Sequence, residues 1–285
     1  MAEVKRTAFR LESEHGGILR ADSWAPSTLN LPHTAVVVCH GFKGFKDWGF
    51  FPHASETLAA RLGCHVVSFN FSGSGVGEDL ETFSEPEAFG RNTFSKECAD
   101  LDTILDGLAG GQLGDLQVPA AESIGVLGHS RGGVAAILAG ERPEVRAVTT
   151  WAAISSPFRY ADAFENVDPG GLVQVTNART GDVLPLYHDV LDDLESNRQR
   201  FDLESSLRRS AVSLLVVHGT EDAAVSPDDA SQLAAAGVDA RLELIPGAGH
   251  TFEVGHPFAG PSLELLAALD LTVEHFADHL GLPTE

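Results

Sequence analysis

The sequence predicts an α/β protein whose mostly parallel, eight-stranded sheet is doubly wound, with helices on both faces. Short β-branched runs alternate with helical patterns along the chain, which is the order that repeated strand–helix units produce. From residue 34 onward these runs are almost continuously apolar, as expected for parallel strands buried on both faces. The 285 residues, 43% of them hydrophobic, suffice for a large core, so we expect one domain over residues 1–285.

Eight segments have the composition of strands: Lys5–Leu11, Ile18–Trp24, Thr34–Cys39, His65–Phe71, Ser123–Leu127, Ala147–Ile154, Ser213–His218 and Arg241–Ile245. His15, Gly16 and Gly17 separate the first two, which predicts an antiparallel hairpin there. Helical patterns cover Pro52–Leu62, Phe94–Leu108, Gly132–Ala139, Pro227–Ala236 and Pro261–Leu280. Ser226 before Pro227 marks a helix start, because serine caps free N–H groups and proline fits the first turn.

The alternation of strands and helices stops between Ser155 and Ser210, over more residues than an ordinary loop needs. Val173–Asp182 has the pattern of a small hairpin, and an amphipathic run follows from Leu186 to Leu194. Long ordered loops often carry function, so we interpret residues 156–210 as a lid inserted after the sixth strand. The alternative is a surface excursion without a function.

The charge of the chain excludes two classes of partner. Its 41 Asp and Glu residues against 19 Lys and Arg give a net charge of −22. Nucleic acids and anionic membranes both require a basic face, so we expect neither as a partner. Only four of the cations are lysines, and many acidic residues with few lysines resemble the surface of a protein adapted to high salt. An ordinary acidic enzyme is the other interpretation, and both stay open.

The sequence favours a cytoplasmic location. Met1–Thr7 carries charges but no apolar segment of the kind that secretory signals contain. No apolar stretch is long enough to span a bilayer. Cys39, Cys64 and Cys98 are an odd number without paired spacing, and the first two lie in or beside apolar runs, which favours buried, reduced thiols.

The pentapeptide Gly128–Gly132 contains the candidate nucleophile, Ser130. A buried strand, Ser123–Leu127, precedes it, and the small apolar residues of Gly133–Ala139 predict a helix after it. A serine at a sharp strand-to-helix turn is typical of a nucleophile in acyl transfer. Glycines two residues to either side are needed because side chains there would collide with neighbouring elements. The strand–turn–helix context carries most of this inference.

Asp222 and His250 are the predicted partners of Ser130. A serine hydroxyl needs a histidine as base and a carboxylate that orients the histidine. The two residues follow the seventh and eighth strands, in the chain order that this fold uses, so they can meet Ser130 at the carboxyl edge of the sheet. Asp222 has two competing interpretations: it forms a turn only, or its neighbour Glu221 is the carboxylate.

Other histidines are weaker candidates for the base. His256 also lies near the last strand. His218 lies within an apolar strand, and we interpret it as a hydrogen-bonded histidine that braces the core or a loop. His129 adjoins the serine but is expected to point elsewhere, because consecutive residues at a tight turn diverge. His250 is preferred over all three.

Two backbone N–H groups are expected to form an oxyanion hole. That of Arg131 directly follows the nucleophile. The second is assigned to Phe42, in the loop after the third strand, where Gly41 permits the backbone to turn its amides inward.

The loop Asn70–Gly77 looks like a phosphate-binding loop but lacks the required spacing. Glu78 stands where the third glycine belongs, and the acidic Asp79 and Glu81 would repel phosphate. We therefore interpret it as a structural turn. No cluster of histidines and carboxylates has metal-binding spacing, and no cofactor or metal is expected.

The motifs together resemble the α/β-hydrolase superfamily over nearly the whole chain. The matching segments are His40–Phe42, Gly128–Gly133, His218–Asp222 and Gly249–Phe252, in that order. Within it, the turn at Asn70–Gly77 and the hairpin-containing insert are similar to those of bacterial cinnamoyl (feruloyl) esterase-like enzymes. This resemblance implies the α/β-hydrolase fold, a small lid over an aromatic acyl group, and carboxylesterase activity. Phe158, Tyr160 and Tyr187 of the insert either line an apolar pocket or form the insert's own small core.

We therefore expect a serine hydrolase that cleaves small-molecule acyl esters through an acyl-enzyme. Ser130 is the nucleophile, His250 the general base and then acid, and Asp222 the orienting carboxylate. Thioester hydrolysis and peptide cleavage by the same residues are alternatives, as is a non-catalytic binding protein of the same fold. A homodimer is left open.

Overall fold

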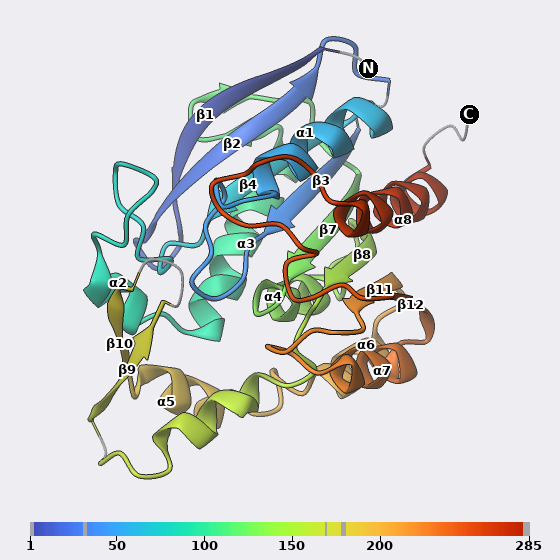
Figure 1. The fold of residues 1–285 in the computed structure, drawn as a ribbon. Coiled ribbons are helices and arrows are strands. Elements are labelled where there is room, and N and C mark those ends of the chain that lie inside the picture. Colours follow the sequence, from blue (N-terminus) through green and yellow to red (C-terminus); the bar gives the residue numbers. More distant parts are fainter. Residues whose placement is uncertain (1–2, 31–32, 169, 178–180, 282–285) are drawn as a thin grey trace.

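In the computed structural model, eight strands form one sheet in the order β1-β2-β4-β3-β7-β8-β11-β12 (Figure 1). The structure describes residues 3–30, 33–168, 170–177 and 181–281. The strands are β1 (Val4–Glu12), β2 (Ile18–Pro26), β3 (Thr34–Cys39), β4 (His65–Asn70), β7 (Ser123–His129), β8 (Val145–Trp151), β11 (Ser213–Gly219) and β12 (Asp239–Ile245). β2 is antiparallel to β1 and to β4, and all other neighbours are parallel. The predicted sheet and its N-terminal hairpin are confirmed.

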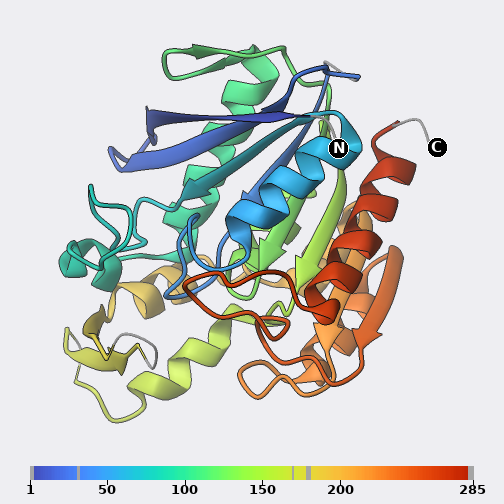
Figure 2. The same cartoon turned by 45° about the horizontal axis from the view of Figure 1, so that its top comes forward.

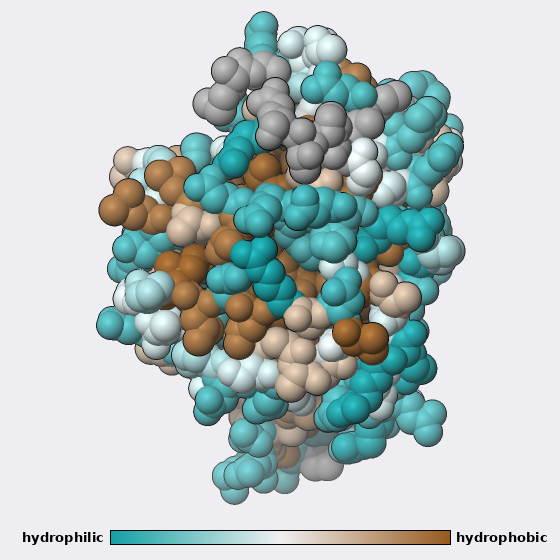
Figure 3. Space-filling model, turned by 90° about the vertical axis from the view of Figure 1, so that its right-hand side faces the viewer, coloured by the Kyte–Doolittle hydropathy of each residue, from teal (hydrophilic) through white to brown (hydrophobic). Residues whose placement is uncertain are grey.

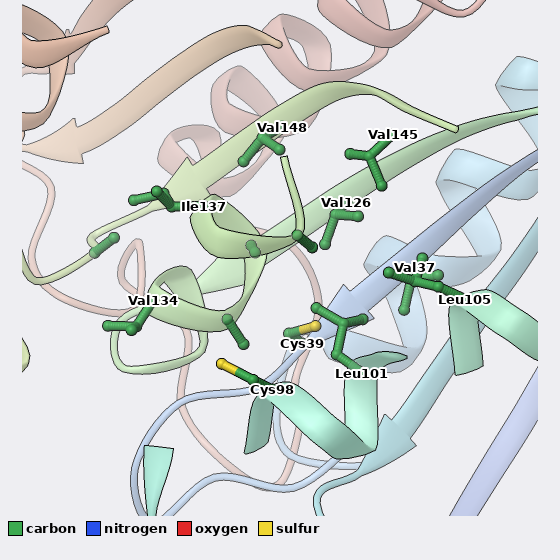
Figure 4. Packing of buried hydrophobic residues seen from close by; sticks show 14 of the residues in the cluster. Val37, Cys39, Cys98, Leu101, Leu105, Val126, Val134, Ile137, Val145 and Val148 are labelled. Carbon is green, nitrogen blue, oxygen red and sulfur yellow. The ribbon is translucent and has the colours of Figure 1, made fainter. Parts of the chain in front are cut away.

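Helices cover both faces of the sheet because alternate residues of each central strand are apolar on opposite sides. The helices are α1 (Phe51–Leu62), α2 (Pro86–Gly90), α3 (Phe94–Gly110), α4 (Gly132–Ala139), α5 (Asp189–Ser196), α6 (Leu203–Arg209), α7 (Pro227–Ala236) and α8 (Leu263–His279). Val36 and Val38 of β3 pack with α1 and α8, whereas Val37 and Cys39 pack with α3 and α4. Figure 4 shows the second of these clusters, in which Leu101 of α3 approaches Cys39.

The limits of the predicted elements differ from the structure where backbone conformation intervenes. The sixth predicted strand ends early, at Trp151, because Ala152 adopts a left-handed conformation with φ of 49°. The last helix starts at Leu263, since the side chain of Ser262 accepts a hydrogen bond from Leu265 N and caps it. Ser226 caps α7 in the same way, as the sequence predicts.

The segment between β8 and β11 contains elements that the sequence pattern does not resolve. A 3₁₀ helix, η1 (Pro157–Phe164), is followed by the hairpin β9 (Leu172–Thr176) and β10 (Val183–Tyr187). The second strand of this hairpin begins after the predicted segment, and Ala178–Thr180 lie outside the described residues. The predicted amphipathic run is divided between the end of β10 and α5. Figures 1 and 2 show this segment beyond the carboxyl ends of β3 and β7.

The periphery of the molecule carries a short hairpin and some exposed apolar side chains. Besides α2 and α6, the sequence pattern misses a two-residue hairpin, β5 (Gln112–Leu113) with β6 (Leu116–Gln117). Figure 3 shows the side on which β12 and α8 lie in Figure 1, where hydrophilic residues surround apolar patches. Leu244 of β12 and Leu263 of α8 are exposed.

All three cysteines are buried, as expected for Cys39 and Cys64. Burial raises the pKa of the Cys64 and Cys98 thiols to about 12. These side chains therefore behave as small apolar residues of the core.

Gly132→Ala tests the close packing at the start of α4. A Cβ atom at this position would lie 2.3 Å from the backbone oxygen of His40, so the substitution is expected to lower the free energy of unfolding by about 2 kcal/mol or more. Gly110→Ala on α3 is the matched control, because its Cβ would meet nothing within 4 Å. The control should stabilise the protein by up to about 1 kcal/mol. Equal unfolding midpoints of the two variants in urea would contradict this interpretation.

Candidate active site

Ser130 occupies the sharp turn between β7 and α4. Its φ of 54° lies in the left-handed region, which is uncommon for a residue with a side chain. The two glycines of the turn make this conformation accessible by giving space to the backbone. A Cβ at Gly128 would lie 2.6 Å from the oxygen of Gly132, and Gly132 itself packs against the oxygen of His40. The steric reason for both glycines is the one that the sequence predicts.

Ser130, His250 and Asp222 form a continuous line of hydrogen bonds. Nε2 of His250 lies 3.1 Å from Oγ of Ser130, and its Nδ1 lies 2.8 Å from Oδ2 of Asp222. Because a carboxylate only accepts, Nδ1 carries the proton and Nε2 is left to accept from the serine hydroxyl. The loops after β7, β11 and β12 bring the three residues together at the carboxyl edge of the sheet.

Asp222 is held as a buried carboxylate by several donors. The backbone N–H groups of Ala224 and Val225 donate to its Oδ1, at 2.8 and 2.9 Å. Burial opposes its charge, but hydrogen bonds from His218 and His250 outweigh burial and lower the pKa of Asp222. The alternative carboxylate, Glu221, is exposed to solvent, so the structure brings Asp222 and not Glu221 to the histidine.

The other histidines occupy supporting positions. His218 is fully buried and its Nε2 lies 3.0 Å from the oxygen of Val225 and 3.3 Å from Asp222, so it braces this loop as predicted. His129 differs from the expectation that it points elsewhere. Its Nε2 donates to the backbone oxygen of His250 at 3.0 Å, because the side chain packs between α1 and the loop after β12. His256 accepts from the N–H of Gly49, so it is engaged elsewhere.

Gly41 leaves space beside Ser130, but its backbone does not adopt a left-handed conformation. A Cβ at this residue would lie 2.8 Å from Cβ of Ser130. Lys43 and Gly49 are the residues of this loop with a positive φ, at 56° and 47°, which corrects the expectation that Gly41 supplies the turn. The loop is fixed from behind, since Asn70 accepts a hydrogen bond from the N–H of Lys46 at 2.7 Å. The loop after β4 thus acts as a brace.

A cavity of about 490 Å³ opens above Ser130 and His250. Its walls come from the loop after β3, from the loops after β7, β11 and β12, and from the segment between β8 and β11. Most of its lining is apolar or aromatic, including Phe42, Ile154 and Tyr160. Such a cavity, with few polar groups at its base, is typical of a site for a small molecule.

Residues 36–260 match the model of the Alpha/beta hydrolase family. The chain belongs to this family. No curated protein matches the sequence. Among solved structures, this hydrolase is similar to Est1E from Butyrivibrio proteoclasticus, with a TM-score of 0.68 and 20% identity over 95% of this chain and 99% of that one.

Two further structures of the same fold are similar to the hydrolase. The esterase domain of a Rhodothermus marinus protein gives a TM-score of 0.64 at 21% identity, over 98% of this chain and all of that one. A puromycin-hydrolyzing peptidase of Mycobacterium tuberculosis gives 0.68 at 20% identity, over 98% of this chain but 40% of that one. At these identities the likeness shows the fold.

The surroundings of the Arg131 side chain, next to Ser130 in the candidate site, are a feature that sequence reasoning missed. The side chain is buried, and its Nε donates to Oε1 of Glu97 at 2.8 Å. Its guanidinium lies 4.0 Å from the ring centre of Phe94 and 4.9 Å from that of Tyr160 in η1. Burial raises the pKa of Glu97, although the charge of Arg131 opposes this shift. A charged residue between Ser130 and the apolar helix α4 is the signal that sequence alone offers.

Within the described ranges, no group of three or more His, Cys, Asp and Glu side chains is arranged to hold a metal ion. Over the same residues, no helix combines the length and apolar character that crossing a membrane requires.

The pH dependence of stability should reveal the buried His40, which begins the loop after β3. Burial, assisted by the nearby charge of Arg131, lowers the pKa of this imidazole from 6.5 to about 4, although the hydrogen bond that Nδ1 donates to the oxygen of Gly41 opposes the shift. Its Nε2 accepts a hydrogen bond from Phe71 N. The unfolded chain binds a proton below about 6.5 and the folded chain only below about 4, so stability is lost as the pH falls between these values.

Urea unfolding at pH 7.5 and pH 5 measures this effect. His40 is expected to contribute a loss of about 2 kcal/mol at pH 5. His40→Gln should show a correspondingly smaller loss between the two pH values. The same loss in wild type and variant would show that His40 is not the group responsible.

Proposed function

We propose that this protein is a serine hydrolase that cleaves carboxylic esters through an acyl-enzyme intermediate. The observation that carries the proposal is the line of hydrogen bonds from Asp222 through His250 to Ser130, at the base of the apolar cavity. Membership of the Alpha/beta hydrolase family supports hydrolysis as the reaction class. The ester specificity and the roles of the residues are part of the proposal.

In the first half of the reaction, Oγ of Ser130 attacks the ester carbonyl carbon and its proton passes to Nε2 of His250. The carbonyl electron pair moves onto oxygen, which gives a tetrahedral intermediate. Collapse of this intermediate breaks the bond to the alcohol, which leaves with the proton from His250. Asp222 keeps Nδ1 protonated and stabilises the imidazolium while it exists.

In the second half, a water molecule gives its proton to His250 and attacks the acyl-Ser130 carbonyl. The tetrahedral intermediate then releases the carboxylic acid, and the proton returns to Oγ. We assign stabilisation of both oxyanions to the backbone N–H groups of Phe42 and Arg131. The proximity of Gly41 to Ser130 supports this assignment, because it brings the loop of Phe42 beside the reacting carbon.

We further propose that residues 156–210 act as a lid over the cavity. Tyr160 of η1, Val175 and Asn177 of the hairpin region, and Leu186 of β10 all line it. A lid that excludes water strengthens the electrostatic interactions beneath it. A structure of Est1E has ferulic acid bound, and the aromatic walls formed by Phe42 and Tyr160 suit a similar aromatic acyl group here.

A serine as nucleophile distinguishes this site from hydrolases that use cysteine or aspartate. Acyl thioesters and peptides are the second class of substrate, favoured by the likeness to a puromycin-hydrolyzing peptidase.

We also propose a cytoplasmic location, since the three buried cysteines are unpaired, as is usual in a reducing compartment.

A panel of aryl esters, alkyl esters and acyl thioesters, assayed with the wild type and Ser130→Ala, tests the proposal. We expect ester turnover by the wild type and a fall in kcat/KM of about 10³-fold or more in the variant, because it lacks the nucleophile. A preference for thioesters would favour the second class. No turnover of any substrate, or turnover that Ser130→Ala leaves unchanged, would refute the proposal.

Two neighbouring carboxylates provide the matched control. Asp222→Asn should lower kcat about 10²- to 10⁴-fold, since it removes the acceptor that orients His250. Glu221→Gln, one residue away and exposed, should change kcat by less than about twofold. The reverse ranking of these variants would assign the orienting role to Glu221.

A further inference from the structure

The charge of the cavity lining is opposite to that of the protein. The whole chain has 41 acidic residues against 19 basic ones. Yet among the described residues that line the cavity, the charged ones are Lys43 and Arg159, and both are cations. No Asp or Glu of the described ranges lines it. A cavity lined by cations and walled by apolar groups focuses a positive potential on whatever enters it.

Lys43 stands on the body of the protein and reaches toward the insert. Its Nζ donates to the backbone oxygen of Thr176 in β9 at 3.1 Å and lies 5.6 Å from the ring centre of Phe42. The residue holds a φ of 56°, which costs free energy for a lysine and suits a glycine better. The sequence thus places a cation at a position where backbone conformation alone favours another residue.

Arg159 stands on the insert and reaches back to the body. Its Nη2 donates to the backbone oxygen of Ala224 at 3.0 Å, and Ala224 also lines the cavity. A carbonyl oxygen takes one N–H of the guanidinium without neutralising its charge, and four other N–H groups belong to the same planar fork. Such a fork matches the two oxygens of a carboxylate.

The catalytic residues do not account for these two cations. The negative charge that develops during acyl transfer lies on the oxyanion. The backbone N–H groups beside Ser130 are proposed to stabilise it. Lys43 and Arg159 instead contact opposite walls, β9 and the loop after β11. Charges on these two walls are available to a second group of the substrate, in addition to the reacting carbonyl.

We propose that the cavity selects esters that carry a carboxylate in addition to the ester bond, with Lys43 and Arg159 as the specificity-determining residues. This inference rests on the proposed hydrolase function and names its class of substrate. Attraction to the two cations offsets the repulsion that an anion meets from the acidic surface of the protein. The competing explanation is that both side chains only tie the insert to the body.

Two pairs of esters separate a carboxylate on the acid side from one on the alcohol side. The acid-side pair is mono-4-nitrophenyl adipate and 4-nitrophenyl hexanoate. The alcohol-side pair is 4-acetoxybenzoate and 4-acetoxybenzamide. Values of kcat/KM, corrected for spontaneous hydrolysis, are compared as the ratio of anionic to neutral ester for wild type, Lys43→Met and Arg159→Gln, at one fixed ionic strength.

We expect this ratio to fall about fivefold in Lys43→Met and in Arg159→Gln, because each substitution removes one nearby positive charge. The fall should occur for the ester pair whose carboxylate lies on the same side of the ester bond as in the natural substrate. Lys43→Arg and Arg159→Lys keep the charge and should retain most of the preference. Arg146→Gln, an exposed residue at the start of β8 and remote from the cavity, is the matched control and should leave the ratio unchanged.

Ratios unchanged within about twofold in both neutral variants would show that the two cations only tie the insert, and would overturn the inference. A wild-type protein that prefers the neutral ester in both the acid-side and the alcohol-side pair would overturn the inference as well. This measurement uses the wild type alone, so it does not depend on the folding of a variant. Hydrolysis of the neutral esters tests the proposed function separately. Loss of the charge preference alone therefore refutes this inference and leaves the hydrolase proposal standing.

Discussion

The close approach of three backbone segments around Ser130 is the constraint on which the rest of the site depends. β7, α4 and the loop after β3 come so near to one another that a Cβ at Gly41, Gly128 or Gly132 would overlap its neighbours. This packing holds Ser130 at a positive φ and directs its hydroxyl toward His250. A strained residue survives only where the surrounding structure determines its conformation, and here two cores, one on each face of the sheet, do so.

The buried ion pair beneath this turn links it to the insert. Arg131 is paired with Glu97 on one side and lies against Tyr160 of η1 on the other. A buried arginine that lost its carboxylate would be strongly destabilising, so the three side chains are held as a unit. Because the backbone N–H of Arg131 is the proposed oxyanion donor, the packing of the insert and the geometry of the reaction centre share one residue.

The sequence predicts the sheet, and the strand ends at which the candidate residues lie, because both are encoded locally. β-Branched runs, strand-end positions and the glycines around Ser130 need no knowledge of distant contacts. What the sequence misses depends on packing between distant segments. The contact of His129 with the backbone of His250 is of this kind, and so is the pairing of Arg131 with Glu97. The split of the predicted amphipathic run into β10 and α5 has the same origin, since β10 is defined by its pairing with β9.

The most direct test of this account is the reaction of the protein with a fluorophosphonate, followed by digestion and mass spectrometry. Only an activated serine attacks this reagent, because the phosphorus mimics the acyl carbon and its oxygen occupies the oxyanion site. We predict one adduct per chain, on Oγ of Ser130. The absence of an adduct, or an adduct on another serine, would contradict the assignment of Ser130 as the nucleophile.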